Sequence, residues 1–465
     1  MTSSKWQTLG WINEPKDSEL AMNKFSYKAQ DKICRVDLSW WNERKVTVWG
    51  AAISGISAAN LLVELGAQVT LSDPKDVHEL PLINILSPKV KTILGQKNQL
   101  AEAEVLIPSP GLKPSHPLLQ EAFSQGIQVM SEIELGAHVT QAKIIAITGT
   151  DGKSTTTSLI EAGLEANGCW AKAVGNIGEP LCNWVLKAPK EGFLVLEVSA
   201  FQLWSTHFLD AEVAIITNIA EDHHDYFDGD ALAYRQSKLR LGHLLKKGAL
   251  LLYPQDRLDP HELHLQVGQR LLDIQLSTYQ APSEPITSPL LGLHNQFNLA
   301  AALEVISYFD IDLKVAQNCF KTFSPLPYRM TLSGVCNGVT YVNDSKATNV
   351  HAAQTGIESI TGSLIVITGG YDKGLDLSPW ISCLQAKSRL VLCIGQTGLQ
   401  IDEKLSQLGL NSLYVETIEQ AVNIAHQKAK EEELVIFSPA ASSYDQFKNF
   451  EERGATFDTL VALLP

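Results

Sequence analysis

The segment ITGTDGKSTTT, residues 147–157, constrains the fold more than any other part of the chain. It follows a short apolar run that predicts a strand, and its glycines let successive backbone N–H groups face a phosphate where a helix begins. Lys153 would reach the terminal phosphates and Ser154 would bind magnesium. The pattern GxxxxGK[ST] is incomplete, because Ile147 stands where its first glycine belongs. We predict a phosphate-binding loop, with an ordinary glycine-containing helix cap as the alternative; the loop residues are Gly149, Thr150, Asp151, Gly152, Lys153, Ser154 and Thr155.

From Lys45 onward, short apolar runs alternate with stretches of helix length, which is typical of α/β units around a parallel sheet. The first unit resembles the start of a Rossmann-like fold, but its turn WGAAISG keeps only Gly50 and Gly55. That turn predicts either a nucleotide site or tight packing of strand on helix. The 465 residues suggest three domains at about 150 residues each. We therefore predict an α/β chain with three tandem domains: an extension at 1–44, a Rossmann-like domain at 45–131, a central P-loop-type domain with a mostly parallel sheet at 132–325, and a C-terminal Rossmann-like domain at 326–465.

The charge balance narrows the class of ligand. The chain carries 37 Lys and Arg against 51 Asp and Glu, a net charge of −14, so a general nucleic-acid binder or a protein of anionic membranes is a poor match. The seven cysteines are scattered and never form a CxxC pair, which indicates a reducing compartment without a disulfide framework. Apolar runs stay short of a membrane span, and the N-terminus lacks a hydrophobic signal core. We expect a cytoplasmic protein that acts on small molecules as a monomer.

Polar residues follow two apolar runs downstream of the loop, where a parallel sheet places its ligands. Glu197 ends the run LVLE, and its carboxylate together with Ser154 would suit magnesium. The segment NIAEDHHD contains His223 beside a cluster of carboxylates, which favours a catalytic role over a solvated loop histidine. Lys238, in YRQSK, taken alone is a surface lysine.

The chain resembles the Mur ligase family of ATP-dependent amide-forming ligases from Lys45 to its C-terminus. The resemblance rests on motifs in family order: TGTDGKST, GNIG, EVSAFQL, NIAEDHHD, YRQSK, LGLHNQFNLAAAL, LPYR, YVNDSKATN and GGYDKG. The tail SPAASSYDQFKNFEERG is similar to the members that add D-glutamate. This resemblance implies that ATP phosphorylates the L-alanine carboxylate of UDP-N-acetylmuramoyl-L-alanine, and that D-glutamate then attacks the acyl phosphate through a tetrahedral intermediate, in peptidoglycan precursor synthesis.

The resemblance also implies roles at the reacting centre. Lys153 stabilises charge on the transferred phosphoryl group, and Asn176 lies at the reacting carboxylate. Two magnesium ions are implied, one held by Ser154 and Glu197 and the second by His223. Lys238 matches a lysine that is carbamylated in the family, where the added anion supports a metal; the alternative is an unmodified lysine paired with phosphate.

The remaining implied residues bind the three substrates. The motif matches place Asn295, Asn298, Arg329 and Asp344 at ATP, with Asn295 and Asn298 on the adenine side, Arg329 near the phosphates and Asp344 at the ribose. They place Lys346, Thr348, Lys373, Ser443, Tyr444 and Phe450 at D-glutamate, and Ser54 and Asp73 at the UDP-sugar. The alternative for Phe450 is an aromatic side chain of the core, and the alternative for Tyr444 is a ring packed on the surface.

Asp151 departs from the asparagine common in this motif, and its charge either caps the helix or weakens ATP binding. Two other functions stay open. One is a ligase that adds L-glutamate to folates, and the other is a nucleotide-binding regulatory protein without ligation chemistry.

Overall fold

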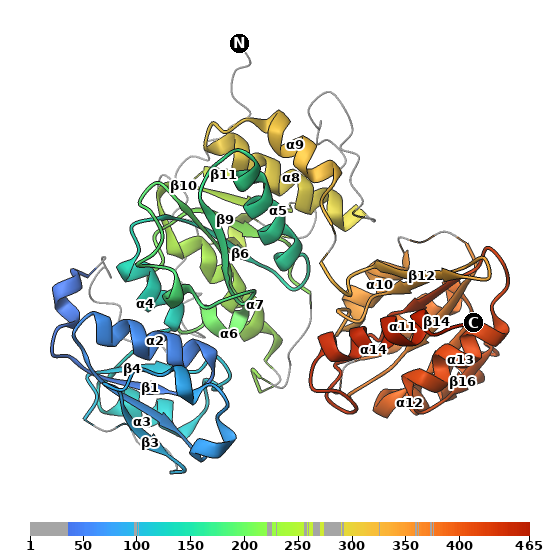
Figure 1. Ribbon diagram of the computed structural model, residues 1–465, viewed down its shortest axis with the longest axis horizontal. Coiled ribbons are helices and arrows are strands. Elements are labelled where there is room, and N and C mark those ends of the chain that lie inside the picture. The colour runs from blue at the N-terminus through green and yellow to red at the C-terminus, as the bar shows by residue number, and fades with distance from the viewer. Residues whose placement is uncertain are drawn as a thin grey trace. The chain divides into compact units, whose positions relative to one another are not determined.

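The computed structural model describes residues 36–96, 100, 102–220, 226–228, 230–254, 258, 260–263, 270–273, 290, 293–324, 326–358, 360, 362–372, 374 and 376–465. The predicted site residues His223 and Lys373 lie outside this set. The chain forms two compact units. The first comprises Met1–Ile219, Leu232–Gln280 and Ala300–Gln317, and the second Ala220–Ala231, Ala281–Leu299 and Asn318–Pro465. Three sheets lie within them, which confirms the predicted α/β class (Figure 1).

The first sheet has five parallel strands in the order β3-β2-β1-β4-β5. Its strands are β1 (Lys45–Trp49), β2 (Gln68–Asp73), β3 (Lys91–Leu94), β4 (Val105–Pro108) and β5 (Gln128–Val129), and its helices are α2 (Ile53–Glu64) and α3 (Pro117–Ser124). Short 3-10 helices cover Leu38–Trp41, Val77–Glu79 and Ile83–Ile85. The strand order reverses at β1, as in Rossmann-like sheets.

The second sheet has six parallel strands in the order β11-β10-β9-β6-β8-β7. Its strands are β6 (Lys143–Thr148), β7 (Ala171–Gly175), β8 (Phe193–Glu197), β9 (Ala211–Ile216), β10 (Leu245–Tyr253) and β11 (Arg270–Asp273). Its described helical segments are α4 (Glu132–Val139), α5 (Lys153–Ala166), α6 (Ala200–Leu203), α7 (Ala231–Leu239) and the 3-10 helices Leu181–Asn183, Arg240–Leu244 and Pro260–Leu263; α8 (Leu293–Tyr308) and α9 (Leu313–Lys321) follow. Strand β6, which leads into the predicted phosphate loop, lies in the middle of this sheet.

The third sheet also has six strands, in the order β12-β13-β17-β14-β15-β16. Its strands are β12 (Thr331–Cys336), β13 (Val339–Asn343), β14 (Leu364–Thr368), β15 (Ser388–Cys393), β16 (Ser412–Tyr414) and β17 (Leu434–Phe437). Its helices are α10 (Val350–Glu358), α11 (Ser378–Lys387), α12 (Gly395–Gln407), α13 (Ile418–Lys428) and α14 (Phe450–Ala462). Only the edge strand β12 is antiparallel to its neighbour, so the other strands direct their carboxyl ends to one edge.

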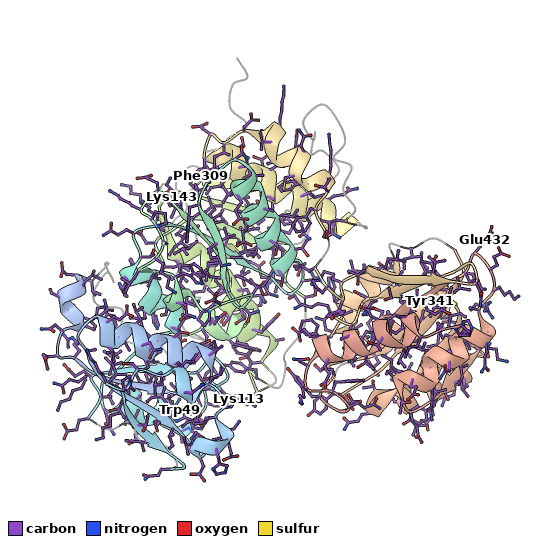
Figure 2. The ribbon with its side chains drawn as sticks, in the orientation of Figure 1. Trp49, Lys113, Lys143, Phe309, Tyr341 and Glu432 are labelled. Atoms are coloured by element: carbon purple, nitrogen blue, oxygen red, sulfur yellow. The ribbon has the colours of Figure 1, made fainter. Side chains whose placement is uncertain are left out.

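One hydrophobic core serves both sheets of the first unit. It runs from Trp41, through β1, α2 and α4, to β6 and β10. Trp41 is fully buried, so the end of the N-terminal extension belongs to the folded unit. At the start of β6, the Lys143 ammonium lies 4.9 Å from the Phe193 ring centre and 5.7 Å from that of Phe309 (Figure 2).

A search of the described residues finds no helix that is both long and apolar enough to span a membrane.

Candidate active site

The predicted phosphate loop joins β6 to α5 in the arrangement that the sequence predicts. Gly152 is the N-cap of α5 and has a φ of 81°, a left-handed conformation that suits glycine. A side-chain carbon at Gly149 would lie 1.9 Å from the Thr217 hydroxyl oxygen, so only glycine fits there. Helix α5 begins at Lys153, and the first turn of a helix presents N–H groups that have no partner within the helix. The loop therefore has the backbone of an anion site.

Two polar residues after β9 brace this loop. The Asn218 amide oxygen accepts the N–H groups of Thr150 at 3.1 Å and Asp151 at 2.9 Å. The Thr217 hydroxyl and the Asn218 amide nitrogen both donate to the Asp151 carbonyl oxygen. The N-cap residue of α5 is Gly152 rather than Asp151. The Lys153 ammonium donates to the Thr150 carbonyl oxygen at 2.7 Å, which holds its charge over the loop.

Glu197 ends β8 next to the loop, because Ile147 of β6 pairs with Glu197 in the sheet. Its Oε1 accepts a hydrogen bond from the Asn176 amide at 2.8 Å, so the structure brings these two predicted residues together. Its Oε2 is buried and has no hydrogen-bond partner within the described part of the chain. A buried carboxylate oxygen without a donor is costly unless a cation satisfies it. With the buried hydroxyl of Ser154, Glu197 supplies the hard oxygen donors that magnesium prefers.

Lys238 is not a surface lysine. Its side chain on α7 is only 2% exposed, and its ammonium donates to the Gly149 carbonyl oxygen at 2.6 Å. The ammonium also lies 4.7 Å from the ring centre of Tyr234, whose hydroxyl is 3.1 Å from that of Thr150. Sequence reasoning missed Tyr234 and Thr217. The signal available for Tyr234 was its position one helical turn before Lys238.

In the second unit, Asn295 and Asn298 are both buried on α8, and Asn298 donates to the Asn295 side-chain oxygen at 2.9 Å. Asp344 follows β13 and is also buried. Its carboxylate accepts from the Ser438 hydroxyl at 2.9 Å and from the Met330 N–H at 3.3 Å. These bonds fix Asp344 beside the segment that contains Arg329. That segment has a left-handed residue, Tyr328, with a φ of 61°.

Two of the residues predicted to bind D-glutamate lie together. The Lys346 ammonium is 3.9 Å from the ring centre of Phe450, the first residue of α14. Phe450 is half-buried, so it is not a core aromatic. Thr348 donates its N–H to the Lys346 carbonyl oxygen at 2.9 Å. Ser443 is buried, whereas Tyr444 is 69% exposed.

Sequence reasoning missed Arg453, a buried arginine at the base of this group. Its Nη2 donates to the carbonyl oxygens of Ser345 at 2.8 Å and Ala441 at 3.0 Å, so it joins the two loops that carry Lys346 and Ser443. Burial lowers the pKa of Arg453 to about 10, which leaves it charged at neutral pH. The only sequence signal was a basic residue in the first turn of a helix, where acidic residues are favoured.

The predicted UDP-sugar residues flank the turn after β1. Asp73 ends β2, and its carboxylate accepts the N–H groups of Ala51 at 2.7 Å and Lys75 at 2.9 Å. Ser54 lies in the first turn of α2. Gly50 has a φ of 105° and closely approaches Ser109, so the small residues of this turn serve tight packing as well.

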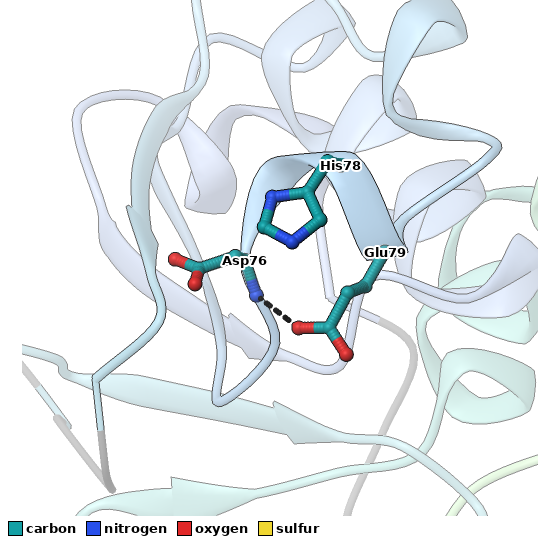
Figure 3. Close-up of side chains that lie close together, drawn as sticks. All are labelled: Asp76, His78 and Glu79. Carbon is teal, nitrogen blue, oxygen red and sulfur yellow. Dashed lines mark hydrogen bonds between the residues drawn. The ribbon is translucent and has the colours of Figure 1, made fainter.

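One group of possible metal ligands stands apart from these sites. Asp76, His78 and Glu79 lie close together, and all three are exposed (Figure 3). The Glu79 carboxylate accepts the Asp76 N–H at 3.0 Å, as in the capping box of a short helix. The local helix cap accounts for this grouping.

Comparisons with known proteins agree with this geometry. Residues 44–131 match "Mur ligase MurD-like, N-terminal domain", residues 147–267 match "Mur ligase middle domain" and residues 328–441 match "Mur ligase, glutamate ligase domain". The chain is 34% identical over 441 residues to UDP-N-acetylmuramoylalanine--D-glutamate ligase of Pasteurella multocida (strain Pm70), with 91% of this chain and 99% of that protein covered. The chain belongs to the Mur ligase family.

A second Mur ligase, with the same name, comes from Chlorobium chlorochromatii (strain CaD3). It is 32% identical over 459 residues and covers 90% of this chain and 98% of its own length. These relatives confirm the family predicted from the motifs.

Solved structures support the fold of this Mur ligase. The UDP-N-acetylmuramate-alanine ligase of Thermotoga maritima has a TM-score of 0.56 at 14% identity, with 90% of this chain and 99% of that chain covered. A bifunctional folylpolyglutamate synthase/dihydrofolate synthase with Mn, AMPPNP and L-glutamate bound has a TM-score of 0.53 at 20% identity, with 71% and 93% covered. At these identities the likeness shows the three-domain fold alone.

Proposed function

We propose that this chain is an ATP-dependent ligase that adds D-glutamate to UDP-N-acetylmuramoyl-L-alanine in peptidoglycan precursor synthesis. The names and the near-complete coverage of its relatives support this reaction. The observation that carries it is the braced phosphate loop beside Glu197, whose buried Oε2 is available to a cation.

The chemistry requires an activated acyl donor, because a carboxylate has no adequate leaving group. The terminal phosphoryl group of ATP is transferred to the L-alanine carboxylate, which gives an acyl phosphate and ADP. The amine of D-glutamate attacks the acyl carbon, and the tetrahedral intermediate loses a proton and expels phosphate to form the amide. Lys153 would stabilise charge on the transferred phosphoryl group. Asn176, held by Glu197, would orient its amide toward the reacting carboxylate.

Glu197 and Ser154 would hold one magnesium ion, which when bound neutralises charge on the phosphates. A second ion at His223 is part of the same proposal. Lys238 would take part as a carbamate, whose anionic oxygens are suited to a metal. The hydrogen bond of the Lys238 ammonium to the Gly149 carbonyl oxygen supports a role for this side chain at the loop.

The remaining residues would bind the substrates. Asn295 and Asn298, Arg329 and Asp344 would hold the adenine, phosphates and ribose of ATP. D-Glutamate carries two carboxylates, and Lys346, Lys373 and the hydroxyls of Thr348 and Ser443 would meet them, with Tyr444 and Phe450 beside the pocket. Ser54 and Asp73 would contact the UDP-sugar.

We further propose that the protein acts as a cytoplasmic monomer without nucleic-acid or membrane partners. The domain limits at residues 131 and 325 are part of this proposal.

The test is phosphate release from MgATP with UDP-N-acetylmuramoyl-L-alanine present and with D-glutamate, L-glutamate or no amino acid added. Release that requires D-glutamate supports the proposal. Release only with a folate and L-glutamate would assign the chain to the folate ligases, and ATP binding without release would indicate a regulatory protein. Lys153→Ala is expected to abolish release, and near-normal turnover of that variant would contradict the proposed ATP site.

A further inference from the structure

A buried group of charged and polar side chains lies behind the proposed site, in the first unit. Glu134 on α4 is almost fully buried, and its Oε2 accepts the N–H of His207 at 2.7 Å. The ring nitrogen Nδ1 of His207 is 2.6 Å from Nη2 of Arg240, and Nη1 of Arg240 donates to the Trp204 carbonyl oxygen at 3.4 Å. No proposed chemical step uses any of these residues.

Arg240 connects the two segments that carry Glu197 and Lys238. Trp204 and His207 belong to the segment that leaves β8 at Glu197 and passes through α6. Arg240 directly follows α7, two residues after Lys238. Because successive residues of a helix are about 100° apart, these two side chains leave opposite sides of the chain. Lys238 therefore reaches the phosphate loop while Arg240 reaches the His207 segment.

The protonation states agree with this arrangement. Burial, and then the charge of Arg240, lower the pKa of His207 to about 3, so the ring is neutral and Nδ1 can accept from the guanidinium. Burial raises the pKa of Glu134, while the charge of Arg240 favours its ionised form. The planar guanidinium of Arg240 reaches two acceptors at once, the His207 ring nitrogen and the Trp204 carbonyl oxygen.

We propose that Arg240 is a positioning residue, which anchors the end of α7 to His207 and thereby holds the Lys238 side chain at the phosphate loop. The anchoring of α7 by Arg240 rests on observed contacts. Its effect on turnover rests on the proposed function.

The test compares Arg240→Met with Arg235→Met in the full-length protein. Arg235 lies on the same helix and pairs with Glu262, so its loss removes an ion pair without touching the His207 segment. Amide hydrogen exchange in the free protein reports the loop directly. We expect exchange of residues 149–153 to rise at least about tenfold in Arg240→Met and to change less than about twofold in Arg235→Met.

Strand β14 of the second unit is the internal reference, and its exchange should not change. A rise at residues 149–153 alone distinguishes positioning from general loss of stability. With substrates present, kcat of Arg240→Met should fall about tenfold while KM for D-glutamate stays within about twofold. His207→Phe, which keeps a ring and removes the acceptor, is the second variant if Arg240→Met does not fold, and should shift loop exchange in the same direction.

Loop exchange within about twofold of wild type in the folded variants would overturn the inference. If the wild-type protein releases no phosphate with D-glutamate, the proposed function is contradicted. The hydrogen-exchange test of Arg240 stays valid in that case.

Discussion

The Lys238 ammonium donates a hydrogen bond to the carbonyl oxygen of Gly149 at 2.6 Å, although 89 residues separate them in the chain. This bond joins α7 to the loop that precedes α5, and it places the only charged group of Lys238 beside the backbone expected to hold phosphates.

Replacement of Lys238 by alanine should therefore reduce kcat by about a hundredfold, because a fixed charge at the reacting groups is lost. Small carboxylates added to the buffer should restore part of the rate if a carbamate is the functional form. Phosphate release measures both effects. Lys246→Ala is the matched control, since Lys246 is exposed and pairs with Glu212 at 3.3 Å. Full activity of the Lys238 variant would argue against any role in turnover.

Asn218→Ala should raise KM for ATP by about tenfold, because the Asp151 N–H loses its Asn218 acceptor and the Thr150 N–H keeps only the Asn218 backbone carbonyl oxygen. KM for D-glutamate should change little. The control is Asn183→Ala, which removes an exposed amide that donates to Glu179 at 3.3 Å. Equal KM values for ATP in wild type and the Asn218 variant would show that the loop keeps its shape without this brace.

The buried Glu132 should make the first unit less stable as pH rises. Burial raises its pKa to about 7 from an ordinary 4.5, although the Cys182 N–H donates to Oε1 at 2.7 Å. Below pH 4.5 the carboxyl is protonated in both states. Between pH 4.5 and 7 only the unfolded state ionises, so stability falls across this window and stays low above it.

Glu132→Gln removes this slope. From pH 4 to pH 8, the free energy of unfolding of the variant should rise by about 3 kcal/mol relative to that of wild type. Urea unfolding of the two proteins at several pH values measures the difference. Glu191→Gln, at an exposed site 3.5 Å from Lys143, is the control and should show almost no such gain. Parallel stability curves for wild type and Glu132→Gln would contradict the prediction.

Gly454 and Tyr328 should be energetically coupled. A methyl group at Gly454 would lie 2.4 Å from the Tyr328 ring, so Gly454→Ala should destabilise the second unit by about 1–3 kcal/mol. Tyr328→Gly makes room and also suits the left-handed backbone there. In a double-mutant cycle measured by urea unfolding, the pair should be more stable than the sum of the single changes predicts. Additive effects would mean that the ring moves aside without cost.

The sequence predicted the architecture well, because buried parallel strands read as apolar runs. The central strands β6, β8, β14 and β17 coincide with such runs. The antiparallel edge strand β12 and the three-residue β16 were not anticipated, since neither has a distinctive pattern. Residues 1–44 were predicted to be an extension, and within its described part Trp41 is fully buried in the core.

The local structure of the candidate site was predictable where a motif sets it, as at Gly152, which caps α5, and Glu197, which ends β8. It was not predictable where a residue acts through a distant partner. Thr217, Tyr234 and Arg453 contact segments far along the chain, and the local patterns around Tyr234 and Arg453 do not show which segments those are.

The shared core of the first unit has a consequence for protein engineering. Apolar side chains of α2 and α4 pack in the same cluster as those of β6 and β10, so a cut between residues 131 and 132 would divide one hydrophobic interior rather than separate two. A chimera that takes only the first sheet from a homologous enzyme would pack side chains from two different proteins against each other in this core. Chimeras should instead transfer both sheets of the first unit as one block, with the recombination breakpoint in the segment before β12.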